Sequence, residues 1–88
     1  MRLRLDKFLK VSRLIKRRTV AKEICDKGRV SVNGQVAKAG ANVKEGDEIA
    51  IQFGQKLVVV QVQSVKETAK KEEADAMYTV IREEKMEV

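Results

Sequence analysis

The chain has 88 residues, with nineteen Lys or Arg against thirteen Asp or Glu, a net charge of +6 and no histidine. This length predicts one domain with a modest core, and no stretch reaches the roughly 18 to 20 apolar residues that span a bilayer, so we expect a cytoplasmic protein without a membrane segment. Without histidine, and without any spacing typical of catalytic or metal-binding groups, the sequence predicts a protein that is not an enzyme and needs no cofactor.

The basic residues are concentrated in the first part of the chain. Residues 1–38 contain twelve Lys or Arg against three acidic residues, a net charge of +9, whereas residues 39–88 contain seven against ten, a net charge of −3. Phosphates that are neutralised by Lys or Arg release counterions, which contributes affinity independent of base sequence. The asymmetry therefore favours nucleic acid as a partner over the simpler interpretation of a solvated basic face.

A first short helix is predicted over residues 5–12. Leu5, Phe8 and Leu9 have the i, i+3, i+4 spacing of an amphipathic helix, and Lys7 and Lys10 project on the opposite side. One face should pack in the core while the other carries charge.

A second helix is expected after the basic run at residues 16–18. Thr19 is its expected N-cap, and Gly28 is placed to adopt the left-handed conformation beyond its C-terminus, so the helix should end near Lys27. Cys25 has no partner for a disulfide and is expected to be a small core residue. The apolar stripe of this helix comprises Val20, Ala21, Ile24 and Cys25.

The next part of the chain predicts a small sheet of four or more strands. Val30 and Val32 alternate with polar residues, and Asn33-Gly34 supplies the two positive-φ positions of a type I′ hairpin before residues 35–37. Residues 49–53 alternate as a half-buried strand after a turn. The valine-rich residues 56–65 fit a strand that is paired on both sides or covered on both faces.

Residues 66–88 are expected to form a charged extension of a domain that covers residues 1–65. Residues 66–76 are rich in Lys, Glu, Asp and Ala, which fits a solvated helix or a disordered connector. A short strand can return at residues 77–81, and residues 82–88 are expected to be mobile.

Several motifs in order resemble the S4-type RNA-binding domain. They are RLDKFL at residues 4–9, KRR at residues 16–18, GRVSVNG at residues 28–34 and EGD at residues 45–47. The resemblance covers residues 3–53 and joins several motifs instead of depending on one glycine pair. It implies an α+β fold of the S4-like (alpha-L) type, with two or three short N-terminal helices packed on a small, mostly antiparallel sheet.

Within this family the chain is similar to the shorter relatives of bacterial heat-shock protein fifteen, and it lacks the extended basic C-terminal helix of that longer protein. The resemblance implies a monomeric, ribosome-associated factor of bacterial ribosome-associated quality control. Its partners would be 23S rRNA, tRNA, the large ribosomal subunit that still holds peptidyl-tRNA, and the NEMF-family factor RqcH, which adds C-terminal alanine tails to stalled chains. Such a factor can act by binding one tRNA arrangement more tightly than the others.

The resemblance places the main RNA contacts on three arginines: Arg4 at the start of the first helix, and Arg17 and Arg18 before the second. Asp6 is expected to orient a neighbouring arginine. Supporting phosphate contacts are expected at Lys7, Lys10, Arg13, Lys16 and Lys22, with weaker candidates on the hairpin at Arg29 and Asn33.

Other functions remain open. A helix-turn-helix DNA-binding regulator would also have two small basic helices, but it would place one of them in the major groove of DNA. An RNA-binding appendage of a modification enzyme would need its catalytic domain on another chain. The S4-like motifs alone do not separate a quality-control factor from a general heat-shock or subunit-recycling factor.

Overall fold

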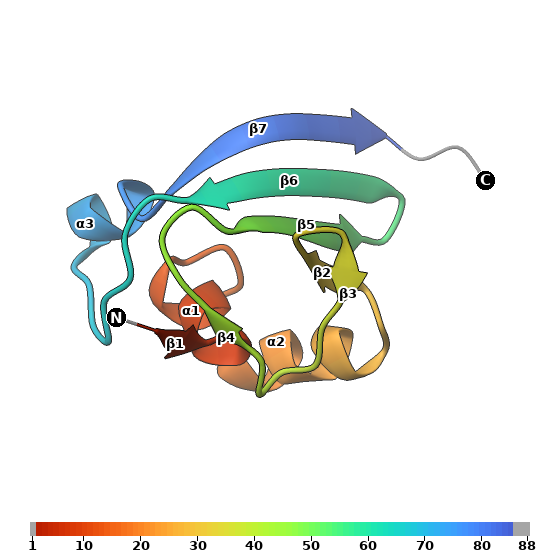
Figure 1. The fold of residues 1–88 in the computed structure, drawn as a ribbon, viewed down its shortest axis with the longest axis horizontal. Helices are drawn as coiled ribbons and strands as arrows, with labels where there is room; N and C mark the ends of the chain where they lie inside the picture. Colours follow the sequence, from red (N-terminus) through yellow and green to blue (C-terminus); the bar gives the residue numbers. More distant parts are fainter. Residues whose placement is uncertain (1, 86–88) are drawn as a thin grey trace.

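The structure is a computed structural model that describes residues 2–85 of the chain. Its helices are α1 (Leu5–Val11), α2 (Arg18–Asp26) and α3 (Lys71–Asp75). Its strands are β1 (Leu3–Arg4), β2 (Val30–Val32), β3 (Gln35–Val36), β4 (Asn42–Val43), β5 (Glu48–Phe53), β6 (Lys56–Val62) and β7 (Tyr78–Lys85). Within these residues, an antiparallel sheet has the order β3-β2-β5-β6-β7, and β1 pairs with β4 beside α1 (Figure 1). The predicted α+β fold, with short N-terminal helices on a mostly antiparallel sheet, is confirmed.

Helix α1 forms where the apolar spacing predicts it. The side chains of Leu5, Phe8 and Leu9 are fully buried, and Phe8 is among the largest of the buried side chains. The helix ends because Arg13 adopts a positive φ of 65°, which an L-residue rarely maintains in a continuing helix.

The start of α2 differs from the prediction. The helix begins at Arg18, with Arg17 at the N-cap position, and the Arg17 side chain makes no capping hydrogen bond. Thr19 is therefore the second residue of the helix and not its N-cap. The extended backbone of Arg17, with φ −121° and ψ 130°, ends the preceding segment at this point, so backbone geometry decides the boundary instead of a capping hydroxyl.

The end of α2 agrees with the prediction. The C-cap is Lys27, and Gly28 follows it with φ +75°. Its N–H donates to Cys25 O at 3.0 Å, and the N–H of Arg29 donates to Ile24 O at 3.1 Å. These two bonds form a Schellman motif, which satisfies carbonyls that the helix end leaves open.

The apolar stripe of α2 is only partly in the core. Ala21 and Cys25 are fully buried and Ile24 is half-buried, but Val20 is 40% exposed. The expectation that Val20 belongs to the buried stripe is wrong, because the helix begins two residues earlier than predicted and Val20 lies in its exposed first turn. Burial, reinforced by the carboxylates of Asp6 and Asp26, raises the pKa of the Cys25 thiol to about 11.

We expect the Cys25 thiol to react slowly with thiol reagents in the native protein. Because the thiolate is the nucleophile, a pKa two units above the ordinary value leaves about 100-fold less thiolate at neutral pH, and burial slows access further. Absorbance during reaction with a disulfide reagent at pH 7 measures the rate, with the same protein in denaturant as the control. Equal rates in the two samples would contradict the buried position.

The β2–β3 hairpin forms as the Asn-Gly pair predicts. Asn33 has φ 52° and Gly34 has φ 85°, and Val32 pairs directly with Gln35 across the turn. Two consecutive positive φ values match the twist of the flanking strands. The loop between the strands is therefore a two-residue turn.

Strand β6 is paired on both sides, with β5 and with β7, but it ends at Val62 instead of continuing to residue 65. Helix α3 forms within the segment that was expected to be a solvated helix or a connector. Strand β7 is longer than the predicted strand at residues 77–81, and residues 82–85, expected to be mobile, pair with β6 as far as Lys56↔Lys85. The side chains of this strand are exposed and largely charged, so the sequence shows no apolar alternation there. Backbone hydrogen bonds to β6 hold the strand in place instead of side-chain burial. Residues 86–88 lie outside the described part.

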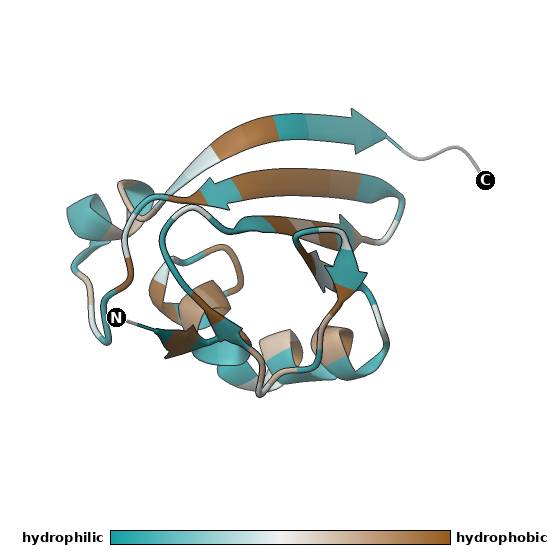
Figure 2. Cartoon of the chain, in the orientation of Figure 1, coloured by the Kyte–Doolittle hydropathy of each residue, from teal (hydrophilic) through white to brown (hydrophobic). Residues whose placement is uncertain are grey.

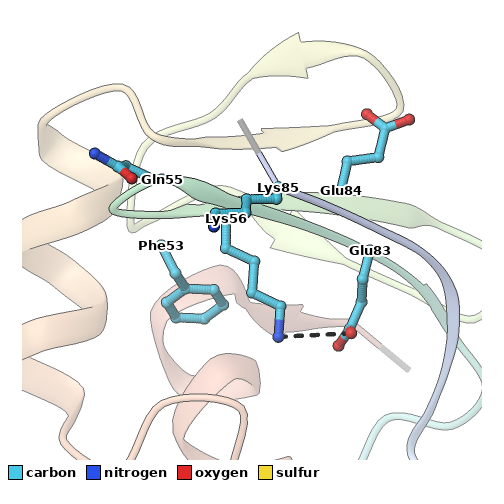
Figure 3. Close-up of a pocket in the computed structure, with 6 residues that line it drawn as sticks. All are labelled: Phe53, Gln55, Lys56, Glu83, Glu84 and Lys85. Atoms are coloured by element: carbon cyan, nitrogen blue, oxygen red, sulfur yellow. Dashed lines mark ion pairs between the residues drawn. The ribbon is translucent and has the colours of Figure 1, made fainter. Parts of the chain in front are cut away.

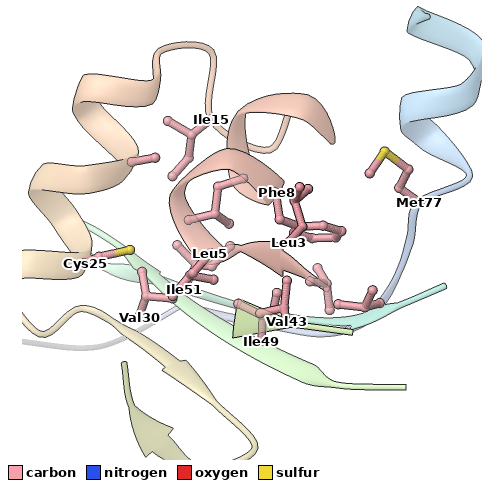
Figure 4. Close-up of a cluster of buried hydrophobic side chains, with 14 of the residues drawn as sticks. Leu3, Leu5, Phe8, Ile15, Cys25, Val30, Val43, Ile49, Ile51 and Met77 are labelled. Atoms are coloured by element: carbon pink, nitrogen blue, oxygen red, sulfur yellow. The ribbon is translucent and has the colours of Figure 1, made fainter. Parts of the chain in front are cut away.

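The core lies between the two N-terminal helices and one face of the main sheet. Apolar segments of β5 and β6 face the helices (Figure 2), and side chains from both N-terminal helices meet Val30, Ile49 and Ile51 there (Figure 4). Met77, just before β7, closes the same cluster. In residues 2–85 no helix is long and apolar enough to cross a bilayer. A boundary at residue 65 between a domain and an extension stays a prediction.

Candidate nucleic-acid interface

The pairing of β1 with β4 positions the first predicted contact, Arg4. Arg4 lies opposite Asn42 in this short ladder. The N–H groups of Leu5 and Asp6 donate to two carbonyls in the segment that precedes β4, at 2.7 and 3.2 Å. These bonds occupy the first donors of α1 and hold the helix start in place, so the N-terminus of α1 is not free to bind an anion.

Asp6 joins the two arginines on which the sequence places most weight. Its Oδ1 accepts from Arg4 Nε at 3.2 Å and from the Lys7 N–H at 2.8 Å, and its Oδ2 accepts from Arg18 Nε at 3.3 Å and Arg4 Nη2 at 3.4 Å. The Asp6 side chain is 3% exposed, whereas those of Arg4 and Arg18 are 52% and 48% exposed. A buried carboxylate thus holds two half-exposed guanidinium groups, as expected for a residue that orients a neighbouring arginine.

The carboxylate of Asp6 is stabilised in its charged form. Burial raises its pKa, but the hydrogen bond and charge of Arg18, the N–H of Lys7 and the charge of Arg4 together lower the pKa below the ordinary value. Asp6 is therefore ionised at neutral pH, and it offsets the repulsion between two guanidinium groups that both contact it.

A surface groove lies at this junction. It has a volume of about 300 Å³ and is lined by Arg4, Asp6, Arg18, Thr19 and Lys22, which we call the arginine groove. The N–H groups of the first three residues of α2 have no partner within residues 2–85, since the first bond of the helix runs from the Ala21 N–H to Arg17 O. Cations and free N–H groups at a helix N-terminus are typical of sites that bind phosphate. Thr19, expected only as a cap, lines this groove.

A second basic cluster lies at the opposite end of α1. Lys10, Arg13 and Lys16 line a separate depression of about 280 Å³. Arg13 occupies the left-handed residue that ends α1, and its N–H donates to Lys10 O at 3.1 Å. Six of the predicted cations thus form two groups, three in the arginine groove and three in this second cluster.

The family model for the S4 domain matches residues 3–49. The chain belongs to the S4-domain family. It is 68% identical over 82 residues to the RQC P-site tRNA stabilizing factor of Halalkalibacterium halodurans, covering 93% of each chain, and 66% identical over 84 residues to the protein of the same name from Bacillus subtilis, covering 96% of this chain and 98% of that one. Among solved structures, it resembles the trimeric Vibrio cholerae Heat Shock Protein 15, with a TM-score of 0.83 and 28% identity, over 91% of this chain and 82% of the other. The expected resemblance to the shorter relatives of heat-shock protein fifteen, the RqcP proteins, is confirmed. The expected monomer stays a prediction.

The remaining predicted contacts of this S4-domain chain lie outside the two basic clusters. Lys7 is half-buried, and Arg17 and Arg29 are exposed. The side chain of Asn33 is engaged within the fold, because its Nδ2 donates to Asp47 Oδ1 at 3.1 Å and its Oδ1 accepts from the Glu48 N–H at 2.9 Å. RNA contacts at these four residues, like those at the six residues of the two clusters, stay predictions.

A further depression of the S4-domain chain, of about 430 Å³, lies where β5 and β7 end and β6 begins (Figure 3). Phe53 lines it while also packing against the core, and Lys56 pairs with Glu83 at 3.5 Å. Glu84 and Lys85 complete the charged lining, so the two lysines are balanced by two carboxylates. This depression does not extend the basic surface.

We expect the Arg13→Gly variant to bind RNA more weakly while keeping or gaining stability. Glycine adopts a positive φ without the steric cost that an L-residue bears, which stabilises the folded state. Glycine also raises the conformational entropy of the unfolded chain, so the net gain in stability is at most about 1 kcal/mol. The variant also loses one cation of the second cluster. Thermal unfolding and binding to large subunits measure the two effects separately, and a loss of stability above about 1 kcal/mol would contradict the backbone interpretation.

Proposed function

We propose that this chain is an RNA-binding factor of bacterial ribosome-associated quality control. It binds 23S rRNA and tRNA on the large ribosomal subunit obstructed by peptidyl-tRNA, and it supports RqcH-dependent C-terminal alanine tailing of stalled chains in the cytoplasm. The observation that carries the proposal is identity of 66–68%, over nearly the whole chain, to proteins named RQC P-site tRNA stabilizing factor. The arginine groove supplies a physical means of binding RNA.

The groove supports a mechanism without chemistry on the RNA. Arg4 and Arg18 are already held by Asp6 before any RNA arrives, so less side-chain freedom is lost on binding than with free arginines. Phosphate contacts of this kind fix the register and orientation of an RNA and carry little base specificity. If the groove contacts one tRNA arrangement and not the others, the protein shifts the population toward that arrangement, and a tenfold preference needs only about 1.4 kcal/mol.

Alanine tails on a stalled reporter protein test the proposal. In cells that lack this protein, we expect the tails to be lost, to return with the wild-type chain and to stay absent with the double variant Arg4→Ala, Arg18→Ala. The double variant Lys56→Ala, Arg82→Ala removes the same charge from the β6–β7 side and should restore the tails. Normal tails in deletion cells would overturn the quality-control role and favour general subunit recycling, whereas preferential binding to duplex DNA would favour a DNA-binding regulator.

A further inference from the structure

A large pocket of mixed polar and apolar lining lies beside the arginine groove, between the β2–β3 hairpin and β4. Its volume is about 750 Å³, and we call it the hairpin pocket. Its lining includes two lysines, one exposed valine and three amide side chains, one of which, Asn33, is already bonded within the fold. The others are Lys38, Lys44, Val36, Gln35 and Asn42. Apart from Asn33, none of these lining residues belongs to the contacts that the S4-like motifs predict.

The charge of the hairpin pocket is positive. Lys38 and Lys44 are exposed, and neither forms an ion pair within the described part of the chain. Asp47 also lines the pocket, but it is buried, and its carboxylate accepts from Asn33 Nδ2 at 3.1 Å and from the Lys44 N–H at 2.9 Å. The two ammonium groups are therefore available to an anion, while the one carboxylate is used within the fold.

The lining also suits a base. Val36 is 64% exposed and lines the pocket. Gln35 and Asn42 are exposed on the same lining, and each amide offers both donors and an acceptor. Proteins recognise unpaired RNA nucleotides by packing on the base face, most often with an aromatic or arginine side chain, together with hydrogen bonds to the base edge. Here Val36 offers the apolar surface and the two amides offer the hydrogen bonds.

The hairpin pocket and the arginine groove are neighbours. Asn42, which lines the pocket, pairs with Arg4, which lines the groove, in the β1–β4 ladder. At Gly40, two residues before Asn42, an added Cβ would lie 3.9 Å from Arg4 Nη2. An RNA strand that leaves the groove can therefore cross the short β4 segment and enter the pocket without a long detour.

We propose that the hairpin pocket is a second RNA-binding site, which takes an unpaired nucleotide and its flanking phosphates from the strand held in the arginine groove. Lys38 and Lys44 bind the phosphates, Val36 contacts the base, and Gln35 and Asn42 bond its edge. The proposal rests on the proposed function, since it extends the RNA surface of the same protein.

Binding of purified large subunits that carry peptidyl-tRNA, measured over a range of salt, tests the pocket. The double variant Lys38→Ala, Lys44→Ala should bind about 10-fold more weakly, with a salt dependence reduced by about 1.5 in the slope of log K against log salt. The matched control Lys56→Ala, Lys85→Ala loses the same charge and should change affinity less than about twofold. The uncharged variant Gln35→Ala, Asn42→Ala should lose affinity about 3-fold with an unchanged slope.

Photo-cross-linking identifies what occupies the pocket. With benzoylphenylalanine in place of Val36, we expect cross-links to rRNA or tRNA, and cross-links only to protein would overturn the proposal. Equal affinity of the Lys38→Ala, Lys44→Ala variant and its control would also overturn it while leaving the proposed function intact. Failure of the wild-type chain to bind large subunits would overturn both.

Discussion

The Asp6→Asn variant should bind large ribosomal subunits about 5- to 20-fold more weakly than the wild-type chain, although the substitution raises the net charge of +6 by one unit. Asparagine has one oxygen where aspartate has two, and its amide nitrogen only donates. If that oxygen keeps the bonds from Arg4 Nε and the Lys7 N–H, the nitrogen faces Arg18 Nε, which is also a donor. Arg18 then loses its anchor and must be ordered again when RNA binds.

Two controls separate positioning from charge and from folding. Binding to an unstructured polyanion such as poly(U) should stay equal or strengthen in the Asp6→Asn variant, because only total charge matters there.

Because the folded-state pKa of Asp6 is lowered, its carboxylate stabilises the fold above the ordinary aspartate pKa, and this contribution is lost as the pH falls through the lowered value. The difference in stability between wild type and variant should therefore be largest near pH 7 and shrink below about pH 4. Tighter binding of the variant to large subunits would show that Asp6 does not position the arginines.

The double variant Arg4→Ala, Arg18→Ala should lose about 100-fold in affinity for large subunits, because each guanidinium provides charge-assisted hydrogen bonds to phosphate. Asp6 contacts Arg18 only through Nε, so the two Nη groups of Arg18 have no partner in residues 2–85. The slope of log K against log salt should fall by about 1.5, since two phosphate contacts disappear. Equilibrium binding at four or more salt concentrations measures both quantities.

The control for this double variant removes the same charge from the other side of the molecule. Lys56 and Arg82 lie on β6 and β7, where each pairs with an exposed glutamate, and exposed pairs of this kind contribute little to stability. We expect the variant Lys56→Ala, Arg82→Ala to bind within about twofold of wild type. If both double variants lose the same affinity, net charge and not the arginine groove governs binding.

The elements with a strong local signal are those that the sequence predicts correctly. The spacing of Leu5, Phe8 and Leu9 depends only on helical period, and Asn33-Gly34 depends only on the backbone angles of one turn. Apart from the start of α2, where the local backbone of Arg17 sets the boundary, the errors occur where backbone pairing between distant segments decides. The two-residue strands β1 and β4 are too short to show a period, and the last residues of β7 are charged yet held by β6.

The sequence predicts which cations belong to the candidate site, but it does not predict which of them lie together. Charge and motif indicate Arg4 and Arg18, but only the β1–β4 pairing and the packing of α1 on α2 bring both onto Asp6. The same packing places Lys10, Arg13 and Lys16 on a separate surface. Single lysines such as Lys38 carry no pattern, so their convergence in the hairpin pocket is visible only in the folded chain.

Sedimentation of the tagged protein through a sucrose gradient of cell lysate, at moderate salt, tests most directly whether the arginine groove binds the obstructed large subunit. We expect the wild-type chain and the Lys56→Ala, Arg82→Ala variant to migrate with large subunits that carry peptidyl-tRNA, and the Arg4→Ala, Arg18→Ala variant to remain at the top. Wild-type protein at the top of the gradient, or spread over all RNA, would contradict this and leave only a basic S4 domain without a specific ribosomal target.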